Sequence, residues 1–155
     1  MALPSPPRDF ARTTLGAHHG PLVRALAEAM LAHADGPTPA RLDALVAEID
    51  AFVSFASQTL RFGLLLMLEV LRFAPVLLLF RVATFGSLPR EERVEVLERM
   101  EQSRLVVLTL VFAAWKSILC FVFFEHPEEL AASGYSPVRR RHGRALPLVH
   151  AEAAE

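Results

Sequence analysis

Residues 88–124 read LPREERVEVLERMEQSRLVVLTLVFAAWKSILCFVFF, and this stretch decides the fold. The proline near its start suits the first position of a helix, where a missing N–H costs nothing. The acids that follow, Glu91 and Glu92, suit the positive end of the helix dipole. Nothing interrupts the helical pattern before His126 and Pro127. The stretch therefore predicts one long central helix, charged in its first half and apolar in its second.

The apolar half, residues 105–124, contains a single charged side chain, Lys116. A helix that is apolar on nearly every side must be buried by protein or by lipid. An unpaired charge in such surroundings costs several kcal/mol. Lys116 is therefore expected to face a polar seam or an acidic group of a partner.

Residues 59–82 form a second apolar run, which three charged side chains interrupt before a fourth, Arg81, near its end. At 100° per residue the first three fall on one narrow stripe of a helix; they are Arg61, Glu69 and Arg72. Pro75 lies inside the run and predicts a kink or a break there.

Two amphipathic helices are expected upstream. The first begins at Pro21, and the second has Thr38 as its N-cap and Pro39 at its first position. Their apolar faces repeat with helical spacing; they consist of Leu22, Val23, Leu26, Met30 and Leu31, and of Leu42, Leu45, Val46, Ile49, Phe52, Val53 and Ala56.

Composition agrees with an all-α fold. The 155 residues are 53 % hydrophobic with only 7 glycines, which disfavours a sandwich or barrel rich in turns. We predict a small bundle of four to five helices over residues 21–135, between a flexible arm (1–20) and a mobile tail with an arginine cluster (136–155). The formal net charge of −1 gives no global basic field for nucleic acid. Arginine supplies every basic residue except Lys116, which is typical of a high-GC bacterial genome.

The residues that carry chemistry form no recognisable constellation. The six histidines lack metal-site spacing, and the adjacent pair His18 and His19 falls in the Gly/Pro-rich arm. Cys120 has apolar neighbours and no histidine base, so a buried structural thiol is expected. The glycines form no phosphate cradle. We therefore predict no catalytic, cofactor-binding or metal-binding residue in this chain, and an enzyme is the least favoured class.

The two apolar runs leave two interpretations open. Spanning a membrane conflicts with the three charges and the proline of residues 59–82, because each mid-span charge costs about 2.5–3.5 kcal/mol. A small bundle cannot cover both runs, and a large exposed apolar patch usually marks a protein interface. A helical subunit that docks on a larger protein is thus favoured, and a small membrane-associated protein with residues 60–82 and 105–124 in lipid is the alternative.

The second half of the chain also carries a recurring pattern. Residues 85–93 read FGSLPREER, and residues 113–124 read AAWKSILCFVFF, with His126-Pro127 and Gly134-Tyr135 beyond them. This order resembles the small helical module that accompanies FAD-dependent oxidoreductases of the glucose–methanol–choline type. That module is an N-terminal extension in long-chain alcohol oxidase-like proteins and a separate chain similar to the third subunit of gluconate 2-dehydrogenase.

The resemblance implies a non-catalytic accessory subunit that binds and stabilises a separate flavoprotein chain, with FAD in the partner and none here. No twin-arginine or secretory signal is visible, so a cytoplasmic location is expected, with peripheral contact at the inner membrane left open. Phe123 and Phe124 stand where the family often has tyrosine, so no hydroxyl role is expected. The predicted partner interface consists of Phe62, Leu66, Phe73, Leu77, Phe80, Phe85, Leu108, Phe112, Trp115, Lys116, Phe123, Phe124 and Tyr135.

Overall fold

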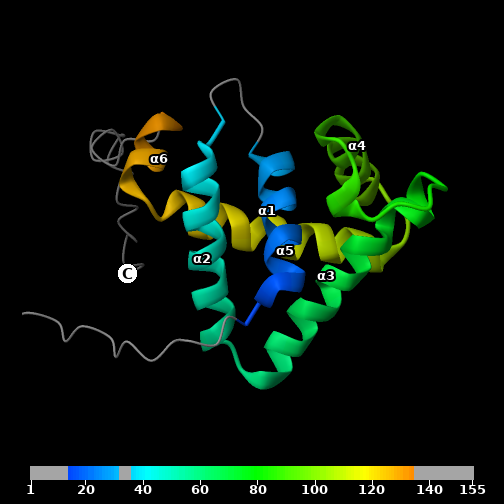
Figure 1. The fold of residues 1–155 in the computed structure, drawn as a ribbon, viewed down its shortest axis with the longest axis horizontal. Helices are drawn as coiled ribbons and strands as arrows, with labels where there is room; N and C mark the ends of the chain where they lie inside the picture. The colour runs from blue at the N-terminus through cyan, green and yellow to red at the C-terminus, as the bar shows by residue number, and fades with distance from the viewer. Residues whose placement is uncertain (1–13, 32–35, 135–155) are drawn as a thin grey trace, which may run out of the picture. The chain divides into compact units, whose positions relative to one another are not determined.

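A computed structural model describes residues 14–31 and 36–134, which are helical and contain no strand (Figure 1). The all-α prediction is confirmed. The chain divides into one unit up to Phe123 and a second from Phe124 onward, to which α6 belongs. Most of the predicted arm and the whole predicted tail lie outside the described residues. The helices are α1 (Gly16–Met30), α2 (Pro39–Phe55), α3 (Gln58–Leu78), the short 3-10 helix η1 (Phe85–Ser87), α4 (Arg90–Glu101), α5 (Val106–Phe124) and α6 (Pro127–Ala132).

Most residues of the apolar faces predicted for the first two helices are buried or half-buried, but Phe52, at the edge of the face of α2, is 40 % exposed. Thr38 caps α2 as expected, since its side chain accepts a hydrogen bond from the backbone N–H of Arg41. The expected start of α1 at Pro21 is wrong, because the helix already begins at Gly16 and Pro21 lies inside it. Pro21 is the sixth residue of α1, past the first N–H groups that lack a helical partner, so the helix tolerates the loss of one hydrogen bond, to the carbonyl of Ala17.

Helix α3 continues through Pro75, so no break occurs there. The backbone N–H of Leu79 donates to the carbonyl of Pro75, and Ser57 caps the other end by accepting from the N–H of Leu60. Arg61 donates to the backbone carbonyl of Ser54 at 2.6 Å, which ties α3 to the end of α2.

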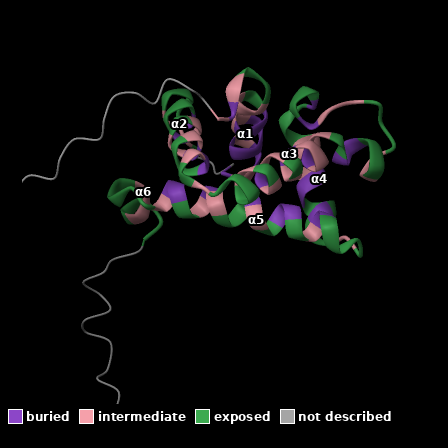
Figure 2. Ribbon diagram, turned by 90° about the horizontal axis from the view of Figure 1, so that it is seen from below, coloured by how far each residue is buried: buried purple, intermediate pink, exposed green. Residues whose placement is uncertain are grey.

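The prediction of a single long helix over residues 88–124 is wrong. It is divided at residues 102–105 into α4 and α5. Polar side chains replace the missing helical hydrogen bonds: Ser103 Oγ accepts from the N–H of Leu105, and Thr109 Oγ1 donates to the carbonyl of Ser103. The turn separates the charged half from the apolar half, so that α5 lies across α1, α2 and α3 (Figures 1 and 2).

The core of the first unit is made entirely of apolar side chains, since no polar or charged residue is buried among the described residues. In this unit, each α-helix turns a buried stripe inward and an exposed one outward (Figure 2). The largest side chains with less than 2 % exposure are Trp115, Phe85, Leu26, Leu45, Ile49, Leu68, Leu71, Met100 and Leu119.

Arg93 is the main polar link between α4 and α1. Its guanidinium donates to Glu28 Oε2 at 2.8 Å and to the backbone carbonyl of Leu88 at 2.8 Å. Hydrogen bonds to charged groups contribute about 1.5–3 kcal/mol each. We expect Arg93→Gln to lower the free energy of unfolding by about 1–3 kcal/mol in urea titrations. Arg104→Gln, at an exposed site, is the control; an equal loss there would contradict a specific role for Arg93.

Candidate functional site

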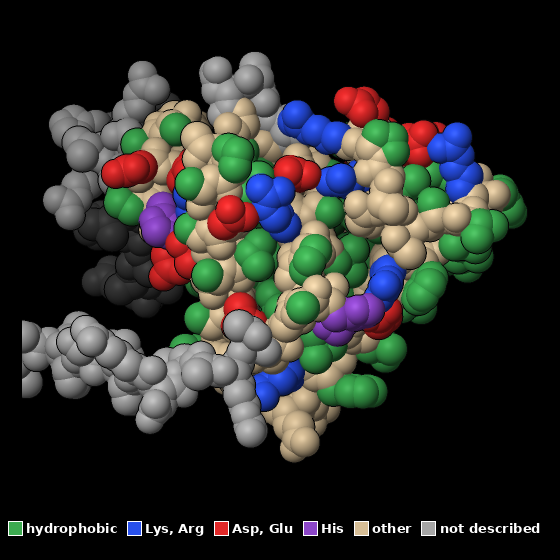
Figure 3. Space-filling model, in the orientation of Figure 1, with side chains coloured by type: hydrophobic (Ala, Val, Ile, Leu, Met, Phe, Trp, Pro, Cys, Tyr) green, Lys and Arg blue, Asp and Glu red, His purple; other side chains and the backbone are tan. Residues whose placement is uncertain are grey.

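Helix α3 exposes an unusually apolar side to solvent. Phe62, Leu66, Phe73 and Leu77 project within about 60° of one another around the helix, at 100° per residue, and their exposed fractions are 69 %, 54 %, 55 % and 54 %. Together with Phe80 we call these five residues the α3 face. Hydrophobic side chains gather along this helix in the space-filling view (Figure 3).

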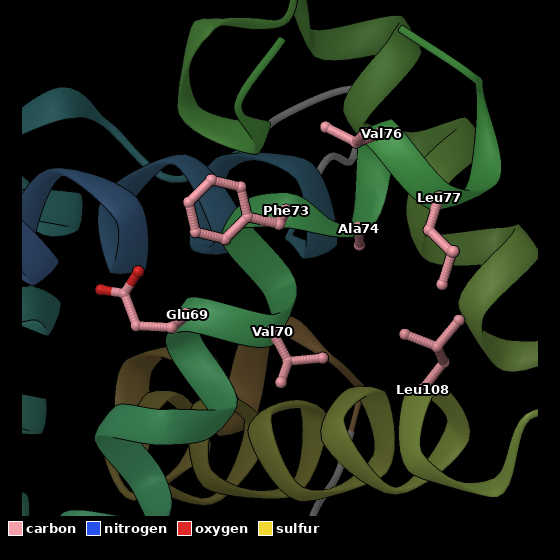
Figure 4. A pocket seen from close by; sticks show the side chains of 7 residues that line it. All are labelled: Glu69, Val70, Phe73, Ala74, Val76, Leu77 and Leu108. Carbon is pink, nitrogen blue, oxygen red and sulfur yellow. The ribbon is translucent and has the colours of Figure 1, made fainter. Parts of the chain in front are cut away.

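A groove of about 530 Å³ borders the α3 face where α3 meets the first turn of α5. Val70, Leu77 and Leu108 point toward the groove, while the carboxylate of Glu69 points away from them (Figure 4). Phe73, Ala74 and Val76 complete the lining. The groove is almost wholly apolar and opens to solvent beside the exposed side chains of α3, so it can accept the apolar side chains of a ligand or partner.

The segment after α3 extends this surface in a strained conformation. Phe80 has a φ of 52°, and its side chain is 90 % exposed. The left-handed region is unfavourable for a bulky residue and marks strain. The neighbouring Arg81 is anchored by ion pairing with Glu92 at 2.5 Å. This anchor holds the strained turn in place and leaves the aromatic ring of Phe80 in water.

Removal of this strain should stabilise the isolated chain. Phe80→Gly is expected to raise the free energy of unfolding of the isolated chain by about 1 kcal/mol, because glycine adopts positive φ without steric cost. Chemical denaturation followed by circular dichroism measures the change. Phe62→Gly, in the first turns of α3, is the control and should be destabilising. A loss of stability in Phe80→Gly would contradict the claim of strain.

A histidine–carboxylate cluster lies on α3 and the first turn of α1. The Nε2 atoms of His18 and His19 lie 3.2 and 2.9 Å from Glu69 Oε1. The two rings meet edge to face with centroids 4.9 Å apart. Arg72 contacts the ring of His18, and its guanidinium lies 3.8 Å from Glu69 Oε2. Histidine, basic and acidic side chains gather over α3 beside hydrophobic ones in Figure 3.

Electrostatics keep Glu69 ionised. Partial burial acts to raise the pKa of Glu69, but the hydrogen bond with His19 and the positive charge of Arg72 act together to hold this pKa below its usual range. The carboxylate is thus an anionic centre approached by nitrogen atoms from two helices. The sequence had predicted that both histidines lie in a flexible arm. This prediction is wrong, because α1 begins before them.

The predicted interface residues divide into two groups. Those of α3 are exposed together with Phe80, as described above. Another group is buried within this chain, and of its members only Leu108 borders the groove; the group comprises Phe85, Leu108, Phe112, Trp115 and Phe123. These side chains lie on the side of η1 and α5 that forms the core. Phe124 is half-buried, and Tyr135 lies outside the described residues.

Lys116 and Cys120 border a second, smaller pocket of about 160 Å³ between α1, α4 and α5. Lys116 is exposed, and its Nζ lies 3.2 Å from Glu101 Oε1. The acidic partner of Lys116 is therefore Glu101 of the same chain. Cys120 is half-buried and carries a free thiol rather than the fully buried one that was predicted. The ion pair of Lys116 with Glu101 is exposed to solvent, which limits its contribution to the free energy of unfolding to about 0–1 kcal/mol.

No protein-family model, curated protein or solved structure matches this chain. The family assignment from the motifs over residues 85–135 therefore stays a prediction.

Proposed function

We propose that this chain is a non-catalytic accessory subunit that binds a larger protein through the α3 face. The observation that carries the proposal is the set of exposed apolar side chains from Phe62 to Phe80, which includes a strained and almost fully exposed aromatic residue. Exposed patches of this kind mark interaction sites. The motifs described above favour a FAD-dependent oxidoreductase of the glucose–methanol–choline type as the partner, with FAD bound by that partner.

The charged groups beside the α3 face favour protein over lipid as its occupant. Glu69 and Arg72 also lie along α3, and both are half-exposed. Charged groups are expensive at membrane depth, but they serve as a polar rim at a protein interface. An apolar helix or loop of the partner, flanked by polar residues, fits these features.

The dimensions of α3 are sufficient for a stable complex. Its 21 residues span about 30 Å at 1.5 Å per residue. A typical specific interface buries about 800 Å² on each partner. The α3 face and the groove supply the apolar centre of such an interface, and the ionic groups near α1 supply part of its rim. Burial of this surface would stabilise both chains in the complex.

A membrane-associated role is the second candidate, and α5 favours it. Among the described helices, α5 alone is long and apolar enough to cross a membrane, with a mean hydropathy of 2.3 over an 18-residue window of which 39 % is buried. Its exposed side chains include Val106, Leu110 and Phe121. The opposite stripe of α5 holds Trp115 and Leu119 in the core. Insertion would therefore require α5 to leave the bundle, whereas docking through α3 leaves the core intact.

Affinity purification of the tagged chain from its native host tests the proposal. We expect stoichiometric recovery of a second chain with the absorbance of a flavin. A tagged double variant, Phe73→Asp with Leu77→Asp, is the matched control. Carbonate-resistant sedimentation of the chain with membranes, without a stoichiometric protein partner, would contradict the proposal and favour the membrane role.

A further inference from the structure

We propose that His18, His19 and Glu69 form a binding site for a divalent transition-metal ion, with Zn²⁺ as the best-fitting ion. Two imidazole nitrogens and one carboxylate oxygen are a ligand set typical of zinc sites that retain one position for water. The inference does not depend on the identity of the partner, although Glu69 also borders the groove beside the α3 face.

Two of the three distances between the ligand atoms are close to those around a tetrahedral ion. The three ligand atoms all lie within 4.8 Å of one another. Zinc bonds of about 2.0–2.1 Å at tetrahedral angles separate neighbouring ligand atoms by roughly 3.3 Å. The two separations from Glu69 Oε1, 3.2 Å to His18 Nε2 and 2.9 Å to His19 Nε2, need only a small expansion to admit the ion.

The cluster also has suitable accessibility. The side chain of His19 is 17 % exposed, that of Glu69 is 34 % exposed, and that of His18 is 56 % exposed. The inner ligands are held by packing between α1 and α3, while the outer ligand remains open to water. An ion can thus enter from solvent and keep a water molecule at its fourth position. Binding would join the first turn of α1 to the middle of α3.

Arg72 is the natural competitor of the ion. Its guanidinium contacts the ring of His18 and lies 3.8 Å from the second carboxylate oxygen of Glu69. A cation in that place repels a metal ion and neutralises its anionic ligand. The arginine side chain is 31 % exposed, so it can swing into water when the ion binds. Competition of this kind predicts a micromolar rather than a nanomolar dissociation constant.

Calorimetric titration of the full-length chain with Zn²⁺ tests the site. We expect one ion per chain, and visible absorption of tetrahedral Co²⁺ when that ion is used instead. Glu69→Gln and His19→Gln should weaken binding by at least about 30-fold, and Arg72→Gln should strengthen it severalfold. His126→Gln is the matched control, because His126 lies at the start of α6, far from the cluster residues in sequence, and it should leave the affinity unchanged.

A second measurement distinguishes a loss of metal binding from a loss of stability in the variants. The rise in melting temperature on adding Zn²⁺ is measured for each variant against its own metal-free sample, because only binding to the folded state raises it. The wild type should show the rise, and Glu69→Gln should not. Equal Zn²⁺ affinities for the wild type, Glu69→Gln and His19→Gln would overturn the proposal, as would a loss of affinity in Arg72→Gln.

Discussion

Replacing Phe73 and Leu77 together by Asp is expected to reduce partner binding at least about 100-fold while the chain stays folded. Both side chains are more than half exposed in the isolated chain, so their loss removes little of its core. In the complex each would become a carboxylate in apolar surroundings, which is strongly destabilising without a partner charge. A 100-fold change corresponds to only about 2.7 kcal/mol, which is less than the expected penalty for two such charges.

The measurement is the dissociation constant of the purified partner for the wild type and the double variant. Circular dichroism of both chains establishes that the helices are retained. A second pair, Val106→Asp with Leu110→Asp, carries the same chemical change on exposed sites of α5 and serves as the control. Equal affinities of the α3 pair and the wild type would contradict docking through α3. A selective loss in the α5 pair would move the interface to α5.

Trp115→Ala is expected to cause the largest loss of stability, about 3–5 kcal/mol, because it leaves a cavity in a close-packed core. The indole is 1 % exposed and is the largest fully buried side chain of the described residues. Its Nε1 has no hydrogen-bond partner in the structure, so the variant loses packing alone. The free energy of unfolding of a small domain is about 5–15 kcal/mol in total. The variant should therefore be only marginally folded.

Urea unfolding followed by circular dichroism measures this effect, since the variant lacks the only tryptophan of the chain. Phe62→Ala, at a site that is 69 % exposed, is the control and should change stability by less than about 1 kcal/mol. A small effect at Trp115 together with a large one at Phe62 would reverse the assignment of core and surface.

Much of the fold follows from local patterns in the sequence. Helical spacing of apolar residues located α2 and its cap, because the buried side chains Leu42, Leu45, Ile49 and Val53 recur with the period of one helix face. The turn between α4 and α5 was missed because it contains neither proline nor glycine. Ser103 and Thr109 replace backbone hydrogen bonds there, and single Ser or Thr residues also occur inside helices, so they do not by themselves predict a break.

The candidate site was only partly predictable. The sequence identified α3 as too apolar for its own chain to cover, and most of the predicted interface residues on α3 are exposed. It could not show which side of α5 faces inward, because a helix that is apolar all round has no preferred face in its own sequence. The histidine cluster was missed because His19 and Glu69 are 50 positions apart. One signal was present, since Glu69 is the sole acid in residues 59–82 and requires a partner.

Hydroxyl-radical footprinting of the chain, free and in its complex, tests the central claim most directly. It reports the solvent accessibility of individual aromatic side chains by their oxidation. We predict that oxidation of Phe62, Phe73 and Phe80 falls strongly in the complex, while Phe121 on the exposed side of α5 is unchanged. Unchanged oxidation of these three residues in a complex of established stoichiometry would contradict docking through the α3 face.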